Sequence, residues 1–136
     1  MKKGALIFIF FMFLVGITDS LNAQEENVVE NVLENIPYQE DGMGKRKLVD
    51  EKYALIMQAA LRPGQRVPQH NANANVHLLI LKGDVVVNLD GIDTRLKEGA
   101  LFPVAHKTPM HVRNESQENA SFLIIKTPNP SEMSTK

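Results

Sequence analysis

The stretch PGQRVPQHNANANVHLLILKGD, residues 63–84, places two histidines, His70 and His77, beside an almost wholly apolar run that stops at Gly83. That run, VHLLILKG, has the length of a β-strand and is typical of a strand covered on both faces. Histidines next to such a strand can bind a metal ion, or they can line a pocket that binds none. Which of these roles they have decides whether the sequence predicts an enzyme.

Short strand-like runs alternate with turn signals along most of the chain. One run ends and another begins on either side of Asp90-Gly91, a pair that supplies the positive φ values of a two-residue hairpin turn. No internal repeat and no helical period interrupts this pattern. It predicts an all-β fold, in which a sheet closes on itself as a barrel. The predicted strands lie in residues 47–61 (two strands), 76–83, 84–96 (a hairpin), 100–105, 110–114 and 120–127.

The chain begins with a segment that has the features of a secretory signal peptide. Lys2 and Lys3 precede a continuous apolar block, residues 4–17, and the small residue Ala23 follows after several polar positions. The apolar block is too short to span a bilayer comfortably, because a spanning helix needs about 20 residues. We therefore predict that residues 1–23 are a signal peptide. The mature protein would be exported to a bacterial periplasm or secreted, with no stable membrane span.

The composition restricts the remaining chain to one small domain. Removing the signal peptide leaves 113 residues without a cysteine, so neither disulfides nor a lipid-modified cysteine is possible. The basic residues are scattered and form no stripe with aromatic residues, which argues against a nucleic-acid partner. A core of this size would gain stability from a partner, and we predict a homodimer.

Three segments follow the signal peptide in the predicted domain organisation. Residues 24–45 form a short N-terminal arm, whose apolar residues have helix-like spacing but could equally belong to an extended arm that pairs with a partner's sheet. Residues 46–128 form the β-barrel domain. Residues 129–136 form a loose polar C-terminal tail.

Two spaced motifs resemble those of the cupins, a superfamily of small jelly-roll β-barrels. In the first motif, five residues separate Gly64 from His70, and Gly83 closes the motif at the expected distance. In the second motif, Gly99 and Asn114 stand at the expected distance from each other. Fifteen residues lie between Gly83 and Gly99, a spacing that is typical of cupins. The resemblance implies a single-domain cupin jelly-roll barrel.

The same resemblance implies where a metal site would be. Cupins bind a metal through two histidines and a glutamate of the first motif and one histidine of the second. In this sequence those positions are His70, Ala72, Val76 and Met110. Only the first offers a nitrogen, and a thioether or a methyl group gives a hard divalent ion no suitable ligand. No cofactor is therefore predicted with the family's own ligand set.

A displaced metal site is the alternative hypothesis. If a β-bulge shifted each strand by one residue, His70, His77 and His111 could bind iron, manganese, nickel or zinc. The protein would then be a metal-dependent enzyme of the dioxygenase, decarboxylase or sugar-acid isomerase type. Strand alternation argues against this site, because a one-residue slip turns a side chain away from the barrel interior.

The main functional prediction is a non-enzymatic barrel that binds a small molecule or serves as an accessory protein. No residue is assigned a catalytic role, and whether the protein is an enzyme stays open. A third hypothesis is a purely structural dimer whose pocket is filled by side chains. The residues predicted to line the pocket are His70, Ala72, Val76, Leu78, Phe102, Met110 and Asn114.

Overall fold

The computed structural model describes residues 30–133, which form nine strands and one short helix. The signal peptide predicted for residues 1–23 lies outside this range. Among the described residues, no helix is long and apolar enough to span a membrane. The elements are β1 Gly44–Glu51, β2 Ala54–Leu61, β3 Arg66–Asn71, β4 Asn75–Lys82, β5 Val85–Leu89, β6 Ile92–Leu96, β7 Leu101–Val104, β8 Pro109–Arg113, β9 Ala120–Thr127 and α1 Pro130–Met133.

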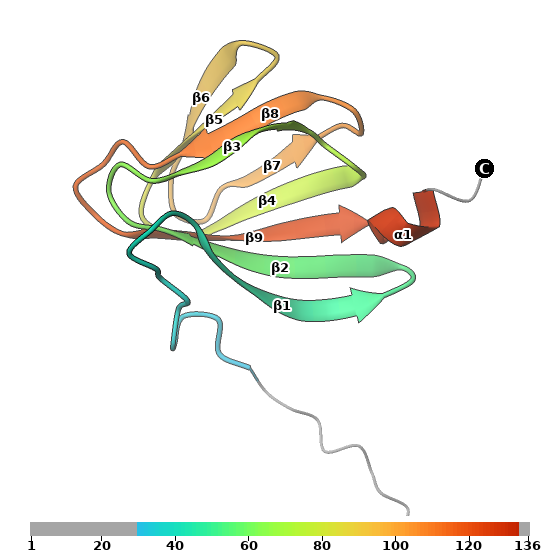
Figure 1. Ribbon diagram of the computed structural model, residues 1–136, viewed down its shortest axis with the longest axis horizontal. Helices are drawn as coiled ribbons and strands as arrows, with labels where there is room; N and C mark the ends of the chain where they lie inside the picture. Colours follow the sequence, from blue (N-terminus) through green and yellow to red (C-terminus); the bar gives the residue numbers. More distant parts are fainter. Residues whose placement is uncertain (1–29, 134–136) are drawn as a thin grey trace, which may run out of the picture.

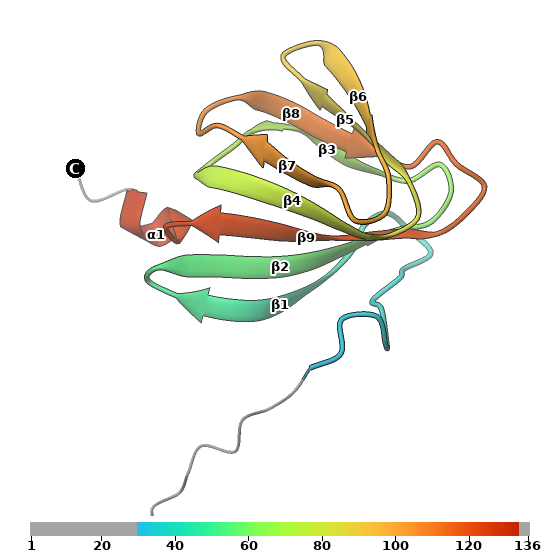
Figure 2. The same cartoon turned by 180° about the vertical axis from the view of Figure 1, so that it is seen from behind.

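The strands form two stacked antiparallel sheets. One has the order β1-β2-β9-β4-β7 and the other the order β3-β8-β5-β6. The two sheets face each other, and the chain crosses between them repeatedly from β3 to β9, as a jelly roll requires (Figure 1). The reverse view shows β7 beside β4 at the edge of the larger sheet (Figure 2). The predicted all-β jelly-roll fold is confirmed.

The hydrophobic core lies between the two sheets and follows the two-residue period of the strands. In β4, Val76, Leu78 and Ile80 are buried, whereas His77 and Leu79 between them are only partly buried. The sequence predicted that this strand is covered on both faces. In the structure only its inner face packs against the second sheet, since its outer face lies on the outside of the sandwich.

Glycines with positive φ mark the turns that the sequence predicted. Asp90 and Gly91 have φ values of 49° and 86°, as a tight hairpin between β5 and β6 requires. The cupin-motif glycines Gly64, Gly83 and Gly99 have φ values of 81°, 70° and 86°. Residues with a side chain rarely adopt such values, so the three glycines are conformational requirements of the barrel.

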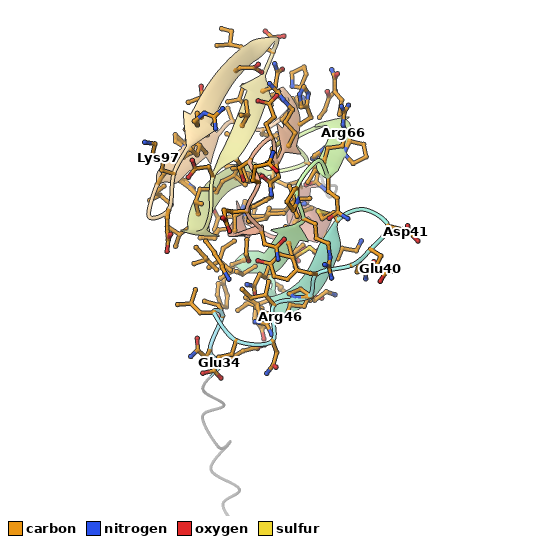
Figure 3. The ribbon with its side chains drawn as sticks, turned by 90° about the vertical axis from the view of Figure 1, so that its left-hand side faces the viewer. Glu34, Glu40, Asp41, Arg46, Arg66 and Lys97 are labelled. Carbon is orange, nitrogen blue, oxygen red and sulfur yellow. The ribbon has the colours of Figure 1, made fainter. Side chains whose placement is uncertain are left out.

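The described part of the predicted arm, residues 30–43, is neither helix nor strand and folds back onto its own sheet. Gln58, which is fully buried on β2, donates hydrogen bonds to the Val32 carbonyl (2.7 Å) and to Ser121 Oγ (2.8 Å). Arg46 Nε donates to Gln58 Oε1 at 2.8 Å. Figure 3 shows the segment passing close to Arg46 before it enters β1, which already begins at Gly44.

The sequence predicted a loose tail over residues 129–136, and the structure describes residues 129–133 of it, which begin with an anchored residue. Asn129 is buried and donates hydrogen bonds to Asp50 Oδ1 (2.8 Å) and to the Glu51 carbonyl (3.2 Å). The single turn of α1 follows, beside the connection between β1 and β2 (Figure 2). These hydrogen bonds connect the segment after β9 to the first hairpin.

Candidate functional site

A cavity of about 190 Å³ lies between the two sheets. Its inner wall is apolar and buried, and its exposed side chains, Lys45, His70 and Asn73, stand where it opens to solvent. Residues from β1, β2, β3, β4, β8 and β9 contribute to it. The lining residues are Met43, Lys45, Met57, Val67, His70, Ala72, Asn73, Val76, Leu78, Met110, Val112, Phe122, Ile124 and Lys126.

Five of the seven residues predicted to line a pocket stand on this wall. They are His70, Ala72, Val76, Leu78 and Met110. His70 on β3 pairs with Met110 on β8, after a register shift that lies between Val67 and His70. The strands thus bring together positions that are up to 40 residues apart in the sequence.

Phe102 does not line the cavity. It lies on β7, opposite Leu78, and packs against the core as a half-buried side chain. Because β7 is the edge strand of the larger sheet, Phe102 closes the side of the core rather than the wall around the cavity. This placement corrects the prediction for Phe102.

Asn114 is also absent from the cavity wall, and its role is structural. Its buried side chain donates hydrogen bonds to the carbonyl groups of Leu61 (3.1 Å) and Glu118 (2.7 Å). Its Oδ1 accepts hydrogen bonds from the Ser116 amide (3.0 Å) and hydroxyl (2.7 Å). Asn114 thereby ties the turn between β8 and β9 to the end of β2.

The two cupin motifs meet in space at this turn. The Gly64 amide donates to the Asn114 carbonyl (2.8 Å), and the Asn114 amide donates to the Gln65 carbonyl (2.9 Å). The first residue of one motif is therefore bonded to the last residue of the other. Gly64 and Asn114 therefore stabilise the fold. This role does not depend on a metal, so both residues match the cupin motifs although three of the four ligand positions do not.

The donor set on the cavity wall does not fit a divalent metal ion. The four positions implied by the family, His70, Ala72, Val76 and Met110, do line one cavity, but they offer one imidazole nitrogen and one thioether. Within residues 30–133, no group of three or more His, Asp or Glu side chains could hold a metal ion. Lys45 and Lys126 on the same wall would repel a cation.

The alternative site of three displaced histidines is not formed. His77 lies on the outer face of the larger sheet, between Pro103 and Ile125, and β4 keeps its register there. His111 lies on the outer face of the smaller sheet, opposite Asn88, also in regular register. Since His70 faces the interior, the three imidazoles lie on three different surfaces, and the bulges that this hypothesis needed are absent at both positions.

His111 belongs instead to a polar network on the outer face of the smaller sheet. Arg113 Nη1 lies 3.1 Å from His111 Nε2, and the same guanidinium pairs with Asp93 (2.6 Å) and Glu115 (2.6 Å). The hydrogen bonds from Arg113, and a further one from Asn88, hold the pKa of the Asp93 carboxyl well below its usual range. The network bridges β8 and β6 across the strand between them.

Three basic side chains, Lys45, His70 and Lys126, line the cavity, and no carboxylate of residues 30–133 does. His70 Nδ1 lies 2.9 Å from the Pro68 carbonyl, which can only accept, so this nitrogen donates. Burial lowers the pKa of Lys126. The lining therefore suits a molecule with an apolar body and a polar or anionic group.

The sequence did not reveal the two lysines of the cavity. In residues 120–127, strand alternation would place Phe122, Ile124 and Lys126 on one face, but the apolar run around Ile124 gives no sign of which face is inward. Lys45 was assigned to the arm, whereas it belongs to β1. Only the pairing of β1, β2 and β9 brings both lysines to the cavity.

Comparison with known proteins agrees with this architecture. No family model matches the chain. An uncharacterized protein of Methanocaldococcus jannaschii is 30% identical over 88 residues, which are 64% of this chain and 76% of that protein. A crystal structure of that archaeal protein is described as an RmlC-like cupin family protein with a double-stranded β-helix fold. It has a TM-score of 0.65 and 28% identity, and the match covers 72% of this chain and 93% of that one.

A second solved structure, of the protein TT1209 from Thermus thermophilus, has a TM-score of 0.68 at 26% identity. The match covers 74% of this chain and 96% of that one. The two facing antiparallel sheets around an interior cavity have the arrangement of a cupin barrel, and the archaeal relative shares this fold and is 30% identical in sequence. The chain belongs to the RmlC-like cupin family.

Proposed function

We propose that this protein binds a small organic molecule in the barrel and is not a metal-dependent enzyme. The observation that carries the proposal is the character of the cavity wall, which is apolar, bears three basic side chains and has no carboxylate from the described residues. A cavity of about 150 Å³ is sufficient to bind benzene in another protein. A cavity of about 190 Å³ therefore suits a ligand with one ring or a short aliphatic chain.

The ligand's polar group is expected at the open end. Lys45 and His70 are exposed there, while Val76, Leu78 and Phe122 are buried deeper in the wall. An aromatic or short aliphatic carboxylate would place its body against the apolar wall and its charge beside Lys45 and the His70 imidazole. Ligands of this kind bind chiefly through the buried apolar area, and the polar contacts set their orientation.

The binding test uses benzoate as the probe and a cavity-filling variant as the comparison. Titration calorimetry and thermal shift should show binding of benzoate to the protein, because its ring and charge match the wall. Ala72→Leu, which fills the cavity, should abolish binding, whereas Ala105→Leu on an exposed loop position should leave it unchanged. Equal binding by Ala72→Leu and the unaltered protein would contradict the proposal.

Elemental analysis separates this proposal from the metal-enzyme alternative. The protein is prepared without chelator and without a metal-binding tag, and iron, manganese, nickel and zinc are measured per chain. We expect far less than one metal ion per chain, because the wall offers a single imidazole nitrogen. A stoichiometric metal that is lost in His70→Ala would overturn the proposal.

A further inference from the structure

We infer that Lys126 is a reactive amine that condenses reversibly with the carbonyl group of a small aldehyde or ketone inside the cavity. This inference rests on the proposed function, because the carbonyl compound has to enter the same cavity. It goes further in naming a covalent step and the residue that performs it. The evidence comes from the position of Lys126 in the sheet, its surroundings and its lack of an ionic partner among the described residues.

Strand pairing places Lys126 on the inner face of the larger sheet. It lies on β9, where it pairs with Leu55 of β2 and with Val76 of β4. Phe122 and Ile124, two and four residues earlier on the same strand, line the cavity as Lys126 does. The lysine therefore stands on a wall whose neighbouring side chains are apolar.

No anion within the described part of the chain compensates the charge of this lysine. Neither an aspartate nor a glutamate of residues 30–133 lines the cavity, and Lys126 has no hydrogen bond or ion pair with any of them. Lys47, on β1 at the edge of the same sheet, shows the contrast, since its Nζ lies 2.7 Å from Asp50 Oδ2. Desolvation without a compensating anion favours the neutral amine, and burial lowers the pKa of Lys126 accordingly.

A neutral amine in an apolar cavity has the properties of a lysine that forms Schiff bases. The Nζ lone pair adds to the carbonyl carbon, and the carbonyl oxygen takes a proton to give a carbinolamine. Loss of one water molecule then forms the C=N bond, and the addition of water reverses the step. No electrons are gained or lost, so the reaction needs neither an oxidant nor a metal.

The test measures how fast each lysine is labelled by limiting benzaldehyde in the presence of cyanoborohydride at about neutral pH. Cyanoborohydride reduces the imine to a stable secondary amine, and peptide mass spectrometry then reports the occupancy of each lysine. We expect Lys126 to be labelled several-fold faster than Lys97, an exposed lysine on the loop after β6 (Figure 3). Labelling of Lys126 no faster than that of Lys97 would overturn the inference.

Two further measurements separate this inference from the proposed function. Ala72→Leu should slow the labelling of Lys126 to the rate of Lys97, since the filled cavity excludes the ring. Lys126→Arg should lose the fast labelling site, and benzoate binding is measured on the unaltered protein. If benzoate binds but Lys126 is not labelled preferentially, the covalent step is wrong and the binding function stands. If benzoate does not bind, and Lys126 is labelled fast in both the unaltered protein and Ala72→Leu, the labelling does not depend on the cavity. Both the proposed binding function and this inference then fail.

Discussion

Four side chains on the cavity wall show that the cupin fold can form without the residues that coordinate a metal ion. His70, Ala72, Val76 and Met110 occupy the positions at which the cupin motifs imply metal ligands, and all four face one cavity. The backbone therefore presents the positions of a metal site, while the side chains at three of them cannot coordinate a hard cation. Restoring the donor atoms should be enough to create a site.

The first prediction follows from this geometry. The triple variant Ala72→His, Val76→Glu, Met110→His should bind about one Co²⁺ or Zn²⁺ per chain, because it provides three nitrogens and a carboxylate around one point. Elemental analysis after dialysis measures the metal. The melting temperature should rise when metal is added, since an ion that binds only the folded state stabilises it.

The matched control for the triple variant adds His70→Ala to the same three changes. This control should lose most of the bound metal if His70 is the fourth ligand. A folded triple variant that retains no more metal than the unaltered protein would show that these positions do not converge closely enough.

Lys126 gives the second prediction, a stability difference that depends on pH. Lys126→Met should raise the melting temperature by a few degrees at about pH 7, because the variant removes the free-energy cost of placing an amine, charged or deprotonated, on an apolar wall. Since burial lowers the pKa of Lys126 in the folded state, the unfolded chain binds more protons and the unfolding free energy of the unaltered protein rises with pH. The advantage of the variant should therefore shrink as the pH approaches 10.5, the ordinary lysine value.

Thermal unfolding at several pH values measures this difference. Lys97→Met is the control, since Lys97 is exposed and its replacement should give no such dependence on pH. A constant advantage of Lys126→Met from neutral to alkaline pH would mean that burial does not favour the neutral form of this lysine.

At the scale of elements, residues 30–43 act as a cover for the outer face of β1, β2 and β9. Gln58 holds this cover, because its amide donates to Val32 and Ser121 while its oxygen accepts from Arg46. A second attachment lies nearer to β1, where Gln65 Nε2 donates to the carbonyl groups of Gln39 and Glu40, both at 3.0 Å. The segment is thus part of the folded domain.

The third prediction concerns this attachment. Gln58→Ala should lower the unfolding free energy by about 1–3 kcal/mol, because buried partners would lose their hydrogen bonds. It should also expose the segment before β1 to limited proteolysis. Denaturant unfolding measures the first effect, and Gln117→Ala, on the exposed turn between β8 and β9, is the control. A change no larger than that of the control would show that Gln58 does not hold the segment.

At the scale of the whole molecule, the outer face of the larger sheet is the surface on which we expect a dimer to form. Leu79 and Ile125 are only partly buried there, and Leu101 at the sheet edge is 60% exposed. A hollow of about 440 Å³ lies on the same face, between the segment before β1 and the strands. Apolar surfaces of this kind are typical of protein interfaces.

The homodimer stays a prediction, and it is the fourth. Analytical ultracentrifugation at micromolar concentration should give twice the mass of one chain. Ile125→Lys, which places a charge on the proposed interface, should give the single-chain mass. Ile92→Lys, at an isoleucine that is 71% exposed on the β5–β6 hairpin, should leave the dimer intact. A single-chain mass for the unaltered protein would defeat the prediction.

Export is the fifth prediction, and it concerns residues outside the described range. The full chain produced in a bacterium should appear in the periplasm or the medium, with an intact mass that begins at Gln24. The basic start and the apolar block of residues 4–17 are the reason. A product that keeps its first 23 residues and stays in the cytoplasm or membrane would contradict this prediction.

The sequence by itself determined the class of fold, the hairpin at Asp90-Gly91 and the orientation of the histidines on β4 and β8. These features depend on local rules, since turn residues set φ and alternation along a strand sets the face of each side chain. The spacing of the two motifs also predicted inward positions for His70 and Met110, and both residues line the cavity.

Only the tertiary structure decided what surrounds those positions. Lys45 and Lys126 reach the cavity because β1, β2 and β9 pair across long stretches of sequence, and Asn114 is consumed by hydrogen bonds to a neighbouring strand end. Strand pairing and the packing of one sheet on another depend on residues that are far apart in the sequence. A local sequence pattern therefore does not predict them. The cavity, its charge and its chemistry therefore follow from contacts between segments that the chain alone keeps far apart.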